Sequence, residues 1–127
     1  MTRLALVALG GAAGSALRYL VASQVQVLAR FTGLPYGTLA VNVLGCFAIG
    51  LLAQLGEARG VFTPEARLLV FTGVLGGFTT FSAFGNEAFD LLRGGSAPAG
   101  IAYVAAHLVL GLGAVAAGRG VGHWLWG

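Results

Sequence analysis

Four long apolar stretches, separated only by short polar linkers, decide what this chain can fold into. They run from Leu4 to Val21, Thr38 to Leu55, Leu68 to Leu92 and Ala99 to Gly118. A helix of about 20 apolar residues crosses the hydrocarbon core of a bilayer, which is about 30 Å thick. The mean hydropathy of +0.89 and the 9% share of charged residues differ from those of soluble domains. The sequence therefore predicts an all-α membrane protein, a single domain of four transmembrane helices over residues 1–127.

The composition also argues against several other classes of protein. Cys46 is the only cysteine, so neither a disulfide nor a thiolate metal site is available. The net charge of +3 comes from seven arginines that are scattered along the chain, which argues against a nucleic-acid surface. Arg3 and the following apolar run are compatible with a signal peptide, but the run is short and three further spans follow, which favours a transmembrane helix.

The third apolar stretch contains a segment that does not suit a continuous helix, Gly73-Val-Leu-Gly-Gly-Phe-Thr-Thr-Phe-Ser-Ala-Phe84. Gly76 and Gly77 weaken a helix, and the hydroxyls of Thr79 and Thr80 can bond to nearby backbone. Unpaired backbone groups cannot face lipid, so irregular backbone at membrane depth lines a cavity or binds an ion. We therefore expect the third helix to be broken at mid-membrane, with residues 76–84 as the functional centre.

Backbone carbonyls released by such a break attract cations. If the break lies on a twofold axis, the carbonyls of Gly76 and Thr79 from two chains supply four oxygens for a small monovalent ion, without any carboxylate. The alternative is a simple kink that packs against a neighbouring helix.

Phenylalanines recur at every third position of the same segment, as Phe78, Phe81 and Phe84, with Ser82 among them. The edge of an aromatic ring is positive, so rings presented edge-on can favour a desolvated anion. At this spacing, phenylalanines on most membrane helices only pack in the core or face lipid. The polar residues between them favour the anion interpretation.

Polar side chains also mark one face of the second and the fourth stretch. Thr38 and Asn42 lie four residues apart, and the Asn42 amide could donate to a small anion or bond to a neighbouring helix. Tyr103, His107 and Gly111 follow the same spacing on the fourth stretch. No carboxylate is paired with His107 by spacing, so neither metal ligation nor nucleophilic catalysis is supported. We expect no enzyme activity.

Arg18 lies near the end of the first apolar stretch, where a charged side chain is costly unless it has a partner or reaches water. It can reach the interface or form a salt bridge with Glu87 or Asp90, and these structural roles are favoured. The alternative is a vestibule role, in which Arg18 draws anions toward a pore mouth.

The arginines are almost balanced between the two ends of the spans. With four spans, both termini share one side, which carries four arginines against three on the other: Arg3, Arg59, Arg67 and Arg119 against Arg18, Arg30 and Arg93. The positive-inside rule sets the orientation of a membrane protein by an excess of Lys and Arg on the cytoplasmic side, and an excess of one arginine is too small to do so. We therefore expect insertion in both directions and an antiparallel, dual-topology dimer with a twofold axis in the membrane plane. A single orientation is the alternative.

Glycines four residues apart indicate close contacts between helices. Several pairs have this spacing, among them Gly10 with Gly14, Gly73 with Gly77, and Gly118 with Gly122. Small residues at this spacing let the backbones of membrane helices touch. Four helices of this size leave no lumen in one chain, so any pore needs an interface.

Taken together, these motifs resemble those of the Fluc (CrcB) fluoride channels over nearly the whole chain. The resemblance rests on Gly10-Gly-Ala-Ala-Gly14 followed by Arg18-Tyr19, on Gly37-Thr38 with Asn42 and Gly45, and on the segment from Gly76 to Phe84. It implies a dual-topology antiparallel homodimer in the cell (inner) membrane, with two fluoride pores and a central sodium ion that is structural and not transported. The alternatives within this class are a homodimer and a heterodimer.

The resemblance also implies roles for single residues. Gly76 and Thr79 match the sodium-binding carbonyls. Phe81 and Phe84 match the paired phenylalanines along the pores, and Asn42 matches the pore asparagine.

Two further residues match by position, and three depart from the family pattern. Arg18 matches the arginine of the first helix, and Tyr103 matches the tyrosine of the fourth. Ala83 replaces a threonine between the phenylalanines, and His107 and Gly111 replace hydroxyl residues below the tyrosine. A protonated His107 could restore an anion partner, so conduction is expected to depend on pH.

The implied function is a fluoride-selective passive channel that exports fluoride and gives fluoride resistance. Fluoride enters acidified cells as HF and is trapped as the anion, so a passive leak is enough to lower it. The pore residues expected are Asn42, Phe81, Phe84, Ser82, Thr38, Tyr103 and His107. Two alternatives remain: a small multidrug-type exporter, which generally needs a carboxylate that this first helix lacks, and a non-conducting subunit of a heterodimeric fluoride channel.

Overall fold

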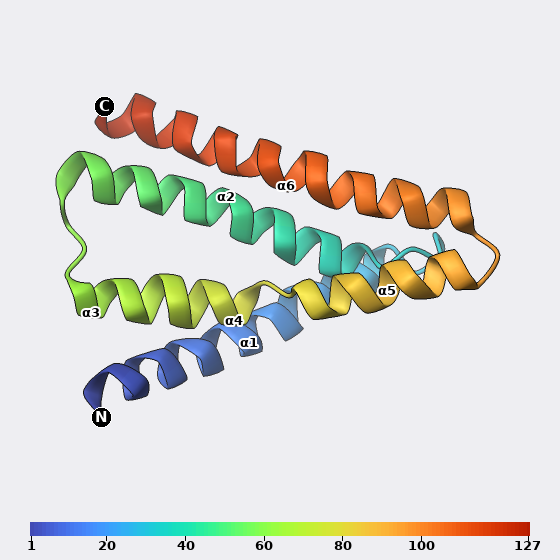
Figure 1. The fold of residues 1–127 in the computed structure, drawn as a ribbon, viewed down its shortest axis with the longest axis horizontal. Helices are drawn as coiled ribbons and strands as arrows, with labels where there is room; N and C mark the ends of the chain where they lie inside the picture. Colours follow the sequence, from blue (N-terminus) through green and yellow to red (C-terminus); the bar gives the residue numbers. More distant parts are fainter.

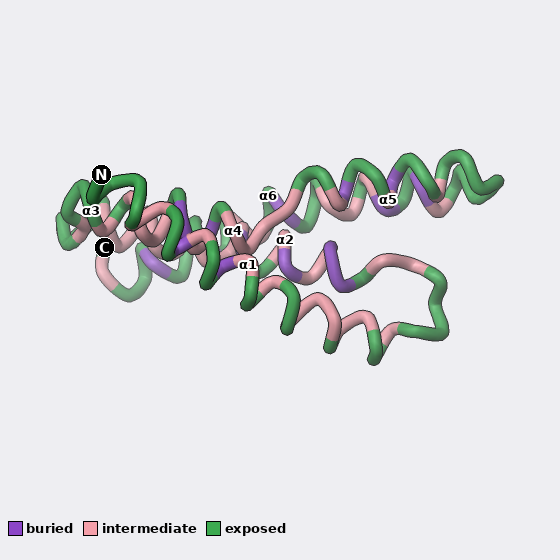
Figure 2. The backbone as a smooth tube through the Cα atoms, turned by 90° about the horizontal axis from the view of Figure 1, so that it is seen from below, coloured by how far each residue is buried: buried purple, intermediate pink, exposed green.

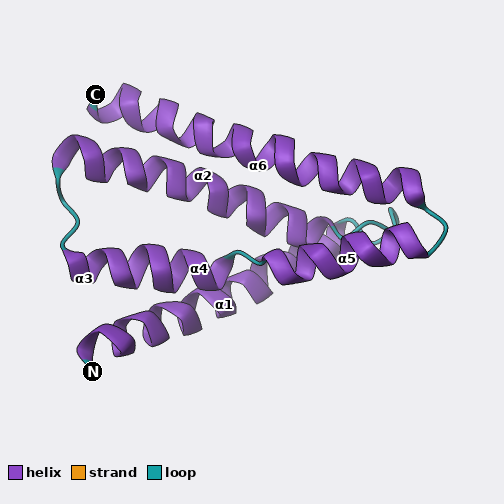
Figure 3. Cartoon of the chain, in the orientation of Figure 1, coloured by secondary structure: helices purple, strands orange, loops and turns teal.

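The computed structural model describes all 127 residues and is helical throughout (Figure 3). Its elements are α1 (Thr2–Leu28), α2 (Tyr36–Arg59), α3 (Pro64–Arg67), the π-helix η1 (Leu68–Leu75), α4 (Gly76–Phe78), α5 (Phe81–Arg93) and α6 (Ala97–Trp126). Four segments are long and apolar enough to cross a membrane, namely α1, α2, the run Pro64–Arg93 and α6. The prediction of an all-α membrane protein with four spans is confirmed, and each helix extends beyond the predicted span.

Both chain termini lie at the same end of the bundle (Figure 1). The connection between α2 and α3 is at that end as well, while the α1–α2 and α5–α6 connections are at the other. Such an arrangement is what an even number of spans requires. The chain is therefore a multi-pass membrane protein whose termini share one side.

The third span is interrupted at Thr79 and Thr80, which have extended backbone conformations (φ −86°, ψ 159° and φ −151°, ψ 110°). The interruption lies within residues 76–84, where it was expected, although Gly76 and Gly77 themselves are helical and form most of α4. Helix η1 before the break is a π-helix, a rare form that is found mainly at functional sites. The interruption thus follows the glycines by two residues.

The two halves of the third span pack against different neighbours. Before the break, η1 and α4 lie against α1, whereas α5 after the break lies against α6. Helix α2 packs mainly along α6 and also contacts α1. The interruption therefore lies where the third span changes its packing partner.

Glycines make the contact between α1 and the first half of the third span. A Cβ atom on Gly10 would collide with the Leu69 carbonyl and the Gly73 backbone, and one on Gly14 would collide with the Val74 carbonyl. These helices touch backbone to backbone, as small residues at this spacing permit.

The C-terminal glycine pair makes a similar contact with α2. A Cβ on Gly118 would meet the Phe47 carbonyl, and one on Gly122 would meet the Gln54 side chain. The predicted helix contacts of all three glycine pairs are confirmed, and they lie within one chain.

Few side chains are buried, and most of the tube in Figure 2 is exposed or intermediate. The buried hydrophobic residues are Val41, Leu75, Phe84, Ala88 and Tyr103, whereas large apolar side chains are exposed along every span. An apolar surface of this extent is not tolerated in water, but it is what lipid requires.

The glycine contacts lead to a prediction that compares two neighbouring residues. Gly10→Ala places a methyl group against backbone atoms of η1, whereas a Cβ on Gly11 meets nothing within 4 Å. Overpacking of this kind costs about 1–3 kcal/mol. Gly10→Ala should therefore lower the melting temperature of the purified protein in detergent, while Gly11→Ala should leave it unchanged. Equal melting temperatures for the two variants would contradict the close contact.

Candidate functional site

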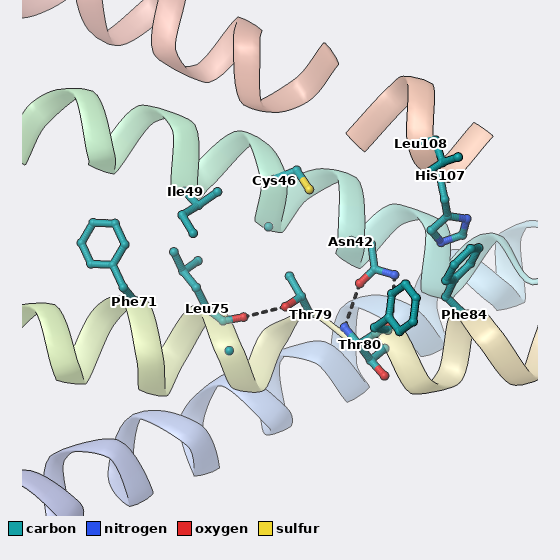
Figure 4. A pocket seen from close by; sticks show the side chains of 13 residues that line it. Asn42, Cys46, Ile49, Phe71, Leu75, Thr79, Thr80, Phe84, His107 and Leu108 are labelled. Atoms are coloured by element: carbon teal, nitrogen blue, oxygen red, sulfur yellow. Dashed lines mark hydrogen bonds between the residues drawn. The ribbon is translucent and has the colours of Figure 1, made fainter. Parts of the chain in front are cut away.

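Asn42 of α2 holds the interrupted backbone of the third span. Its Nδ2 donates to the Thr80 carbonyl at 3.0 Å, and its Oδ1 accepts from the Thr80 N–H at 2.8 Å (Figure 4). The Thr80 hydroxyl caps α5 by accepting from the Ala83 N–H at 3.2 Å. A buried backbone group without a partner is costly. The side chain of Asn42 thus replaces the helical hydrogen bonds that Thr80 gives up.

The same contacts release the carbonyls of Gly76 and Thr79 from their regular helical partners. In a continuous helix, the Gly76 carbonyl would accept from the Thr80 N–H and the Thr79 carbonyl from the Ala83 N–H. Both of these N–H groups donate elsewhere, to Asn42 and to the Thr80 hydroxyl. The carbonyls of Gly77 and Phe78 likewise receive no bond from the N–H groups of Phe81 and Ser82, so the two carbonyls that were predicted to leave the helix are among four that do.

The side chain of Thr79 bonds to the helical segment that precedes the break. Its hydroxyl donates to the Leu75 carbonyl at 3.0 Å, as does its backbone N–H. A Cβ on Gly45 of α2 would collide with the Thr79 methyl group. Gly45 is therefore required for α2 to approach the break.

A cavity of about 390 Å³ lies beside the break, between α2, the third span and α6 (Figure 4). Most of its lining is apolar, with contributions from Ile49, Phe71, Leu75 and Leu108. The structure brings six of the predicted site residues to this cavity: Asn42, Gly76, Thr79, Phe81, Phe84 and His107.

The two phenylalanines of the cavity differ in their surroundings. Phe81 and Phe84 meet edge to face, with ring centroids 5.4 Å apart. Phe84 is only 9% exposed and lies 4.2 Å from the His107 ring and 5.9 Å from the Tyr103 ring, whereas Phe81 is 82% exposed. Phe84 thus belongs to an aromatic wall within the chain, and Phe81 projects away from it.

Thr38 and Tyr103 lie outside the cavity and are joined by a carboxylate. The Thr38 hydroxyl donates to Oε1 of Glu87 and the Tyr103 hydroxyl to Oε2, both at 2.7 Å. The Tyr103 hydroxyl also lies 3.3 Å from the Pro35 carbonyl. Glu87 therefore ties α2, α5 and α6 together. From the sequence, Glu87 was expected only as a possible partner of Arg18, although a carboxylate within an apolar span indicates a role of its own.

Of the alternatives considered for Arg18, the salt bridge to Glu87 or Asp90 is not formed in the chain. Arg18 donates from Nη1 to the Thr79 carbonyl at 3.3 Å, because α1 packs on the half of the third span that ends at the break. The one ion pair of the structure joins Arg119 to Glu57.

Ser82 also lies outside the cavity. It is exposed, and its Oγ is 3.3 Å from the Thr80 hydroxyl. Of the predicted site residues, Thr38, Tyr103, Ser82 and Arg18 thus surround the cavity without lining it.

These features define the class of protein as a multi-pass membrane protein with a span that is interrupted beside a largely apolar cavity. The chain belongs to the CrcB family, because the model described as CrcB-like protein, Camphor Resistance (CrcB), matches residues 5–119. The resemblance that the motifs indicated is confirmed.

Relatives from several bacteria match nearly the full chain. A protein of Rhizobium etli (strain CIAT 652) is 52% identical, with 91% of this chain and 92% of the relative covered. A protein of Agrobacterium fabrum is 47% identical, with 99% and 100% covered, and one of Chloroflexus aurantiacus is 44% identical, with 100% of both covered. All three are named fluoride-specific ion channel FluC. A family of ion channels agrees with the prediction that the chain is not an enzyme.

The contact between Asn42 and Thr80 leads to a second prediction. Asn42→Ala removes the partners of the Thr80 N–H and carbonyl, at a cost of about 1–3 kcal/mol for each buried group. The variant should melt at a lower temperature, and the Thr80 amide should exchange with deuterium faster. Asn86→Ala is the control, because the Asn86 amide bonds only to the exposed Asp90 carboxylate at 3.1 Å. A Thr80 amide that exchanges equally slowly in Asn42→Ala would contradict this role of Asn42.

Proposed function

We propose that this protein is a fluoride-selective, passive anion channel of the cell membrane. The observation that carries the proposal is the meeting of Asn42, Phe81 and Phe84 at one cavity beside the break. Named relatives that are 44–52% identical over nearly the whole chain support fluoride as the anion.

The cavity offers weak but directional contacts to an anion. Nδ2 of Asn42 carries two N–H groups, of which one donates to Thr80, so the second is available to a ligand. The ring edges of Phe81 and Phe84 add positive potential without a full charge. A site with few donors and no charged side chain does not trap an anion, which a conduction pathway requires.

Passive transport fits the acidic residues of the chain, because none is placed for coupling to protons. The four are Glu57, Glu65, Glu87 and Asp90. Glu57 is paired with Arg119, and Glu87 is bonded to two hydroxyls. Export then follows from the trapping of fluoride in a cytoplasm that is less acidic than the surroundings.

A second copy of the chain would complete the pathway. Phe81 and the backbone of Gly76 line the cavity, yet both are exposed in the single chain. The polar backbone at the break and the exposed Phe81 ring would have to be shielded from lipid. An antiparallel copy, related by a twofold axis in the membrane plane, would shield them. The balance of four arginines against three supports insertion in both directions.

The carbonyls at the break fit a structural sodium ion between two copies. Gly76 and Thr79 have lost their regular helical partners, and two copies would provide four carbonyl oxygens, the hard ligands that Na⁺ prefers at unwound helices. No group of three His, Cys, Asp or Glu side chains lies together to hold a metal in another way. When bound, the ion would neutralise the converging carbonyl dipoles. The Arg18 guanidinium would remain next to the Thr79 carbonyl.

The proposal predicts rapid fluoride efflux from liposomes that contain the purified chain alone. Efflux of chloride should be much slower, and exchange of sodium for a large organic cation should reduce the fluoride rate by weakening the dimer. The measurement uses fluoride- and chloride-selective electrodes, with protein-free liposomes as the control for leakage of HF. A well-folded chain that releases no fluoride would contradict the proposal and point to a subunit that needs a different partner. Fluoride efflux that does not depend on sodium would contradict the proposed sodium site and leave the proposed channel function standing.

The aromatic residues of the cavity lead to a further prediction. Phe81→Ile and Phe84→Ile remove the ring edges and should each cut the fluoride rate by more than about tenfold, the equivalent of about 1.4 kcal/mol. Phe89→Ile is the matched control, because Phe89 lies on the same helix α5, is 57% exposed and does not line the cavity. A double variant of Phe81 and Phe84 that conducts at the full rate would exclude the ring edges as anion ligands.

A further inference from the structure

Two side chains of helix α1 donate hydrogen bonds to carbonyls that the break releases. The Ser15 hydroxyl donates to the Gly77 carbonyl at 3.4 Å, and Nη1 of Arg18 donates to the Thr79 carbonyl at 3.3 Å. Neither carbonyl receives a backbone hydrogen bond from the next turn, because the helix is interrupted there. Helix α1 thus supplies donors to the break, in addition to those of α2.

The glycines of α1 explain why these two side chains reach the break. A Cβ atom on Gly14 would collide with the backbone of η1, and one on Gly77 would collide with the backbone of Gly11. Helix α1 therefore lies directly against η1 and α4 (Figure 1). Ser15 follows Gly11 by four residues and Arg18 follows Gly14 by four, so each lies one turn further along the same face of α1.

The charge of Arg18 has no counter-ion within the chain. The one ion pair joins Arg119 to Glu57, and the hydrogen-bond partner of Arg18 is the neutral Thr79 carbonyl. Glu87 of α5 is already engaged by two hydroxyls, and no carboxylate lines the cavity beside the break. A full positive charge therefore lies at one of the two carbonyls that fit a sodium ion.

We propose that Arg18 lowers the affinity of the break for sodium, because its guanidinium and the ion share the Thr79 oxygen. The inference rests on the proposed function, in which the carbonyls of Gly76 and Thr79 bind the ion. A carbonyl oxygen has two lone pairs, so it can accept from Arg18 and bind a cation at the same time. Two positive charges on one oxygen atom repel each other, and a protein screens this repulsion less than water does. Arg18 is thus a positioning residue that acts through Thr79.

Ser15 provides the comparison that separates charge from hydrogen bonding. It lies on the same helix and also donates to a released carbonyl, but its hydroxyl is neutral. In the proposed twofold dimer each copy brings one Arg18, so two guanidiniums act on one ion. We therefore expect the sodium affinity to depend on Arg18 and not on Ser15.

The repulsion acts in both directions, because the two ligands of the Thr79 oxygen are thermodynamically linked. If the guanidinium weakens the binding of sodium, bound sodium weakens the hydrogen bond of the guanidinium by the same factor. Arg18 stays beside the carbonyl, but its N–H hydrogens exchange faster with water. Sodium therefore changes a property of Arg18 that can be measured without any conduction.

The test measures the sodium affinity of the purified protein from its melting temperature in detergent at increasing concentrations of sodium chloride. A large organic cation, N-methyl-D-glucamine, keeps the ionic strength constant, so that screening does not change. Arg18→Gln removes the charge and should lower the apparent dissociation constant for sodium by at least about tenfold, because the repulsion between two charges this close exceeds the free energy of a tenfold change. Arg18→Lys keeps the charge and should bind sodium as weakly as the wild type. Ser15→Ala is the matched control and should also resemble the wild type.

A second measurement uses the wild type and does not depend on the folding of a variant. NMR of protein labelled with ¹⁵N-arginine follows the guanidinium signals of Arg18, which are assigned by their absence in Arg18→Lys. Exchange of the Arg18 N–H hydrogens with water should be faster in sodium than in N-methyl-D-glucamine. Equal exchange in the two cations would overturn the inference.

The outcomes separate this inference from the proposed function. Sodium affinity that is unchanged or weaker in Arg18→Gln, or that rises equally in Ser15→Ala, would show that the charge of Arg18 does not oppose the ion. If the wild type releases fluoride but no protein responds to sodium, the sodium site and this inference both fail and the channel stands. If the chain conducts no fluoride, yet Arg18→Gln binds sodium more tightly, the inference stands and the proposed conduction fails.

Discussion

The two hydrogen bonds between Asn42 and Thr80 are the interaction on which the rest of the site depends. They satisfy the N–H and the carbonyl of one residue, and thereby allow the third span to leave its helix without exposing polar backbone. The interruption releases backbone carbonyls from their helical hydrogen bonds, and it lies beside the cavity and where the span changes its packing partner. A side chain from a neighbouring helix here replaces the hydrogen bonds that a helix would otherwise make within itself.

Hydropathy and glycine spacing predicted the four spans and their contacts, because both are local properties that lipid and close packing impose directly. The exact position of the break was harder to predict from the sequence. Gly76 and Gly77 have the weaker helix propensity, yet they remain helical, since the break is set by a tertiary contact from α2. The partners of Glu87 and Arg18 were not found from the sequence for the same reason, because they depend on which helices become neighbours, and a single sequence does not contain that information.

The polar residues of the bundle divide into two groups with different physical roles. Around Glu87, every oxygen and hydroxyl is engaged, so this cluster stabilises the junction of three helices. At the cavity, Asn42 retains a free N–H, so this group can serve a ligand. Residues that look alike in sequence, as polar positions on one helix face, are thus separated by whether the fold already satisfies them.

The change of packing partner within the third span has a mechanical consequence. Helices η1 and α4 touch α1 backbone to backbone at glycines, whereas α5 packs on α6, so the two halves of the span pair with different neighbours. A change in tilt between the pairs would be taken up by the backbone dihedral angles of Thr79 and Thr80. Bilayers of different thickness impose different tilts on helices of one length. The dimensions of the cavity at this joint are therefore coupled to the lipid that surrounds the protein.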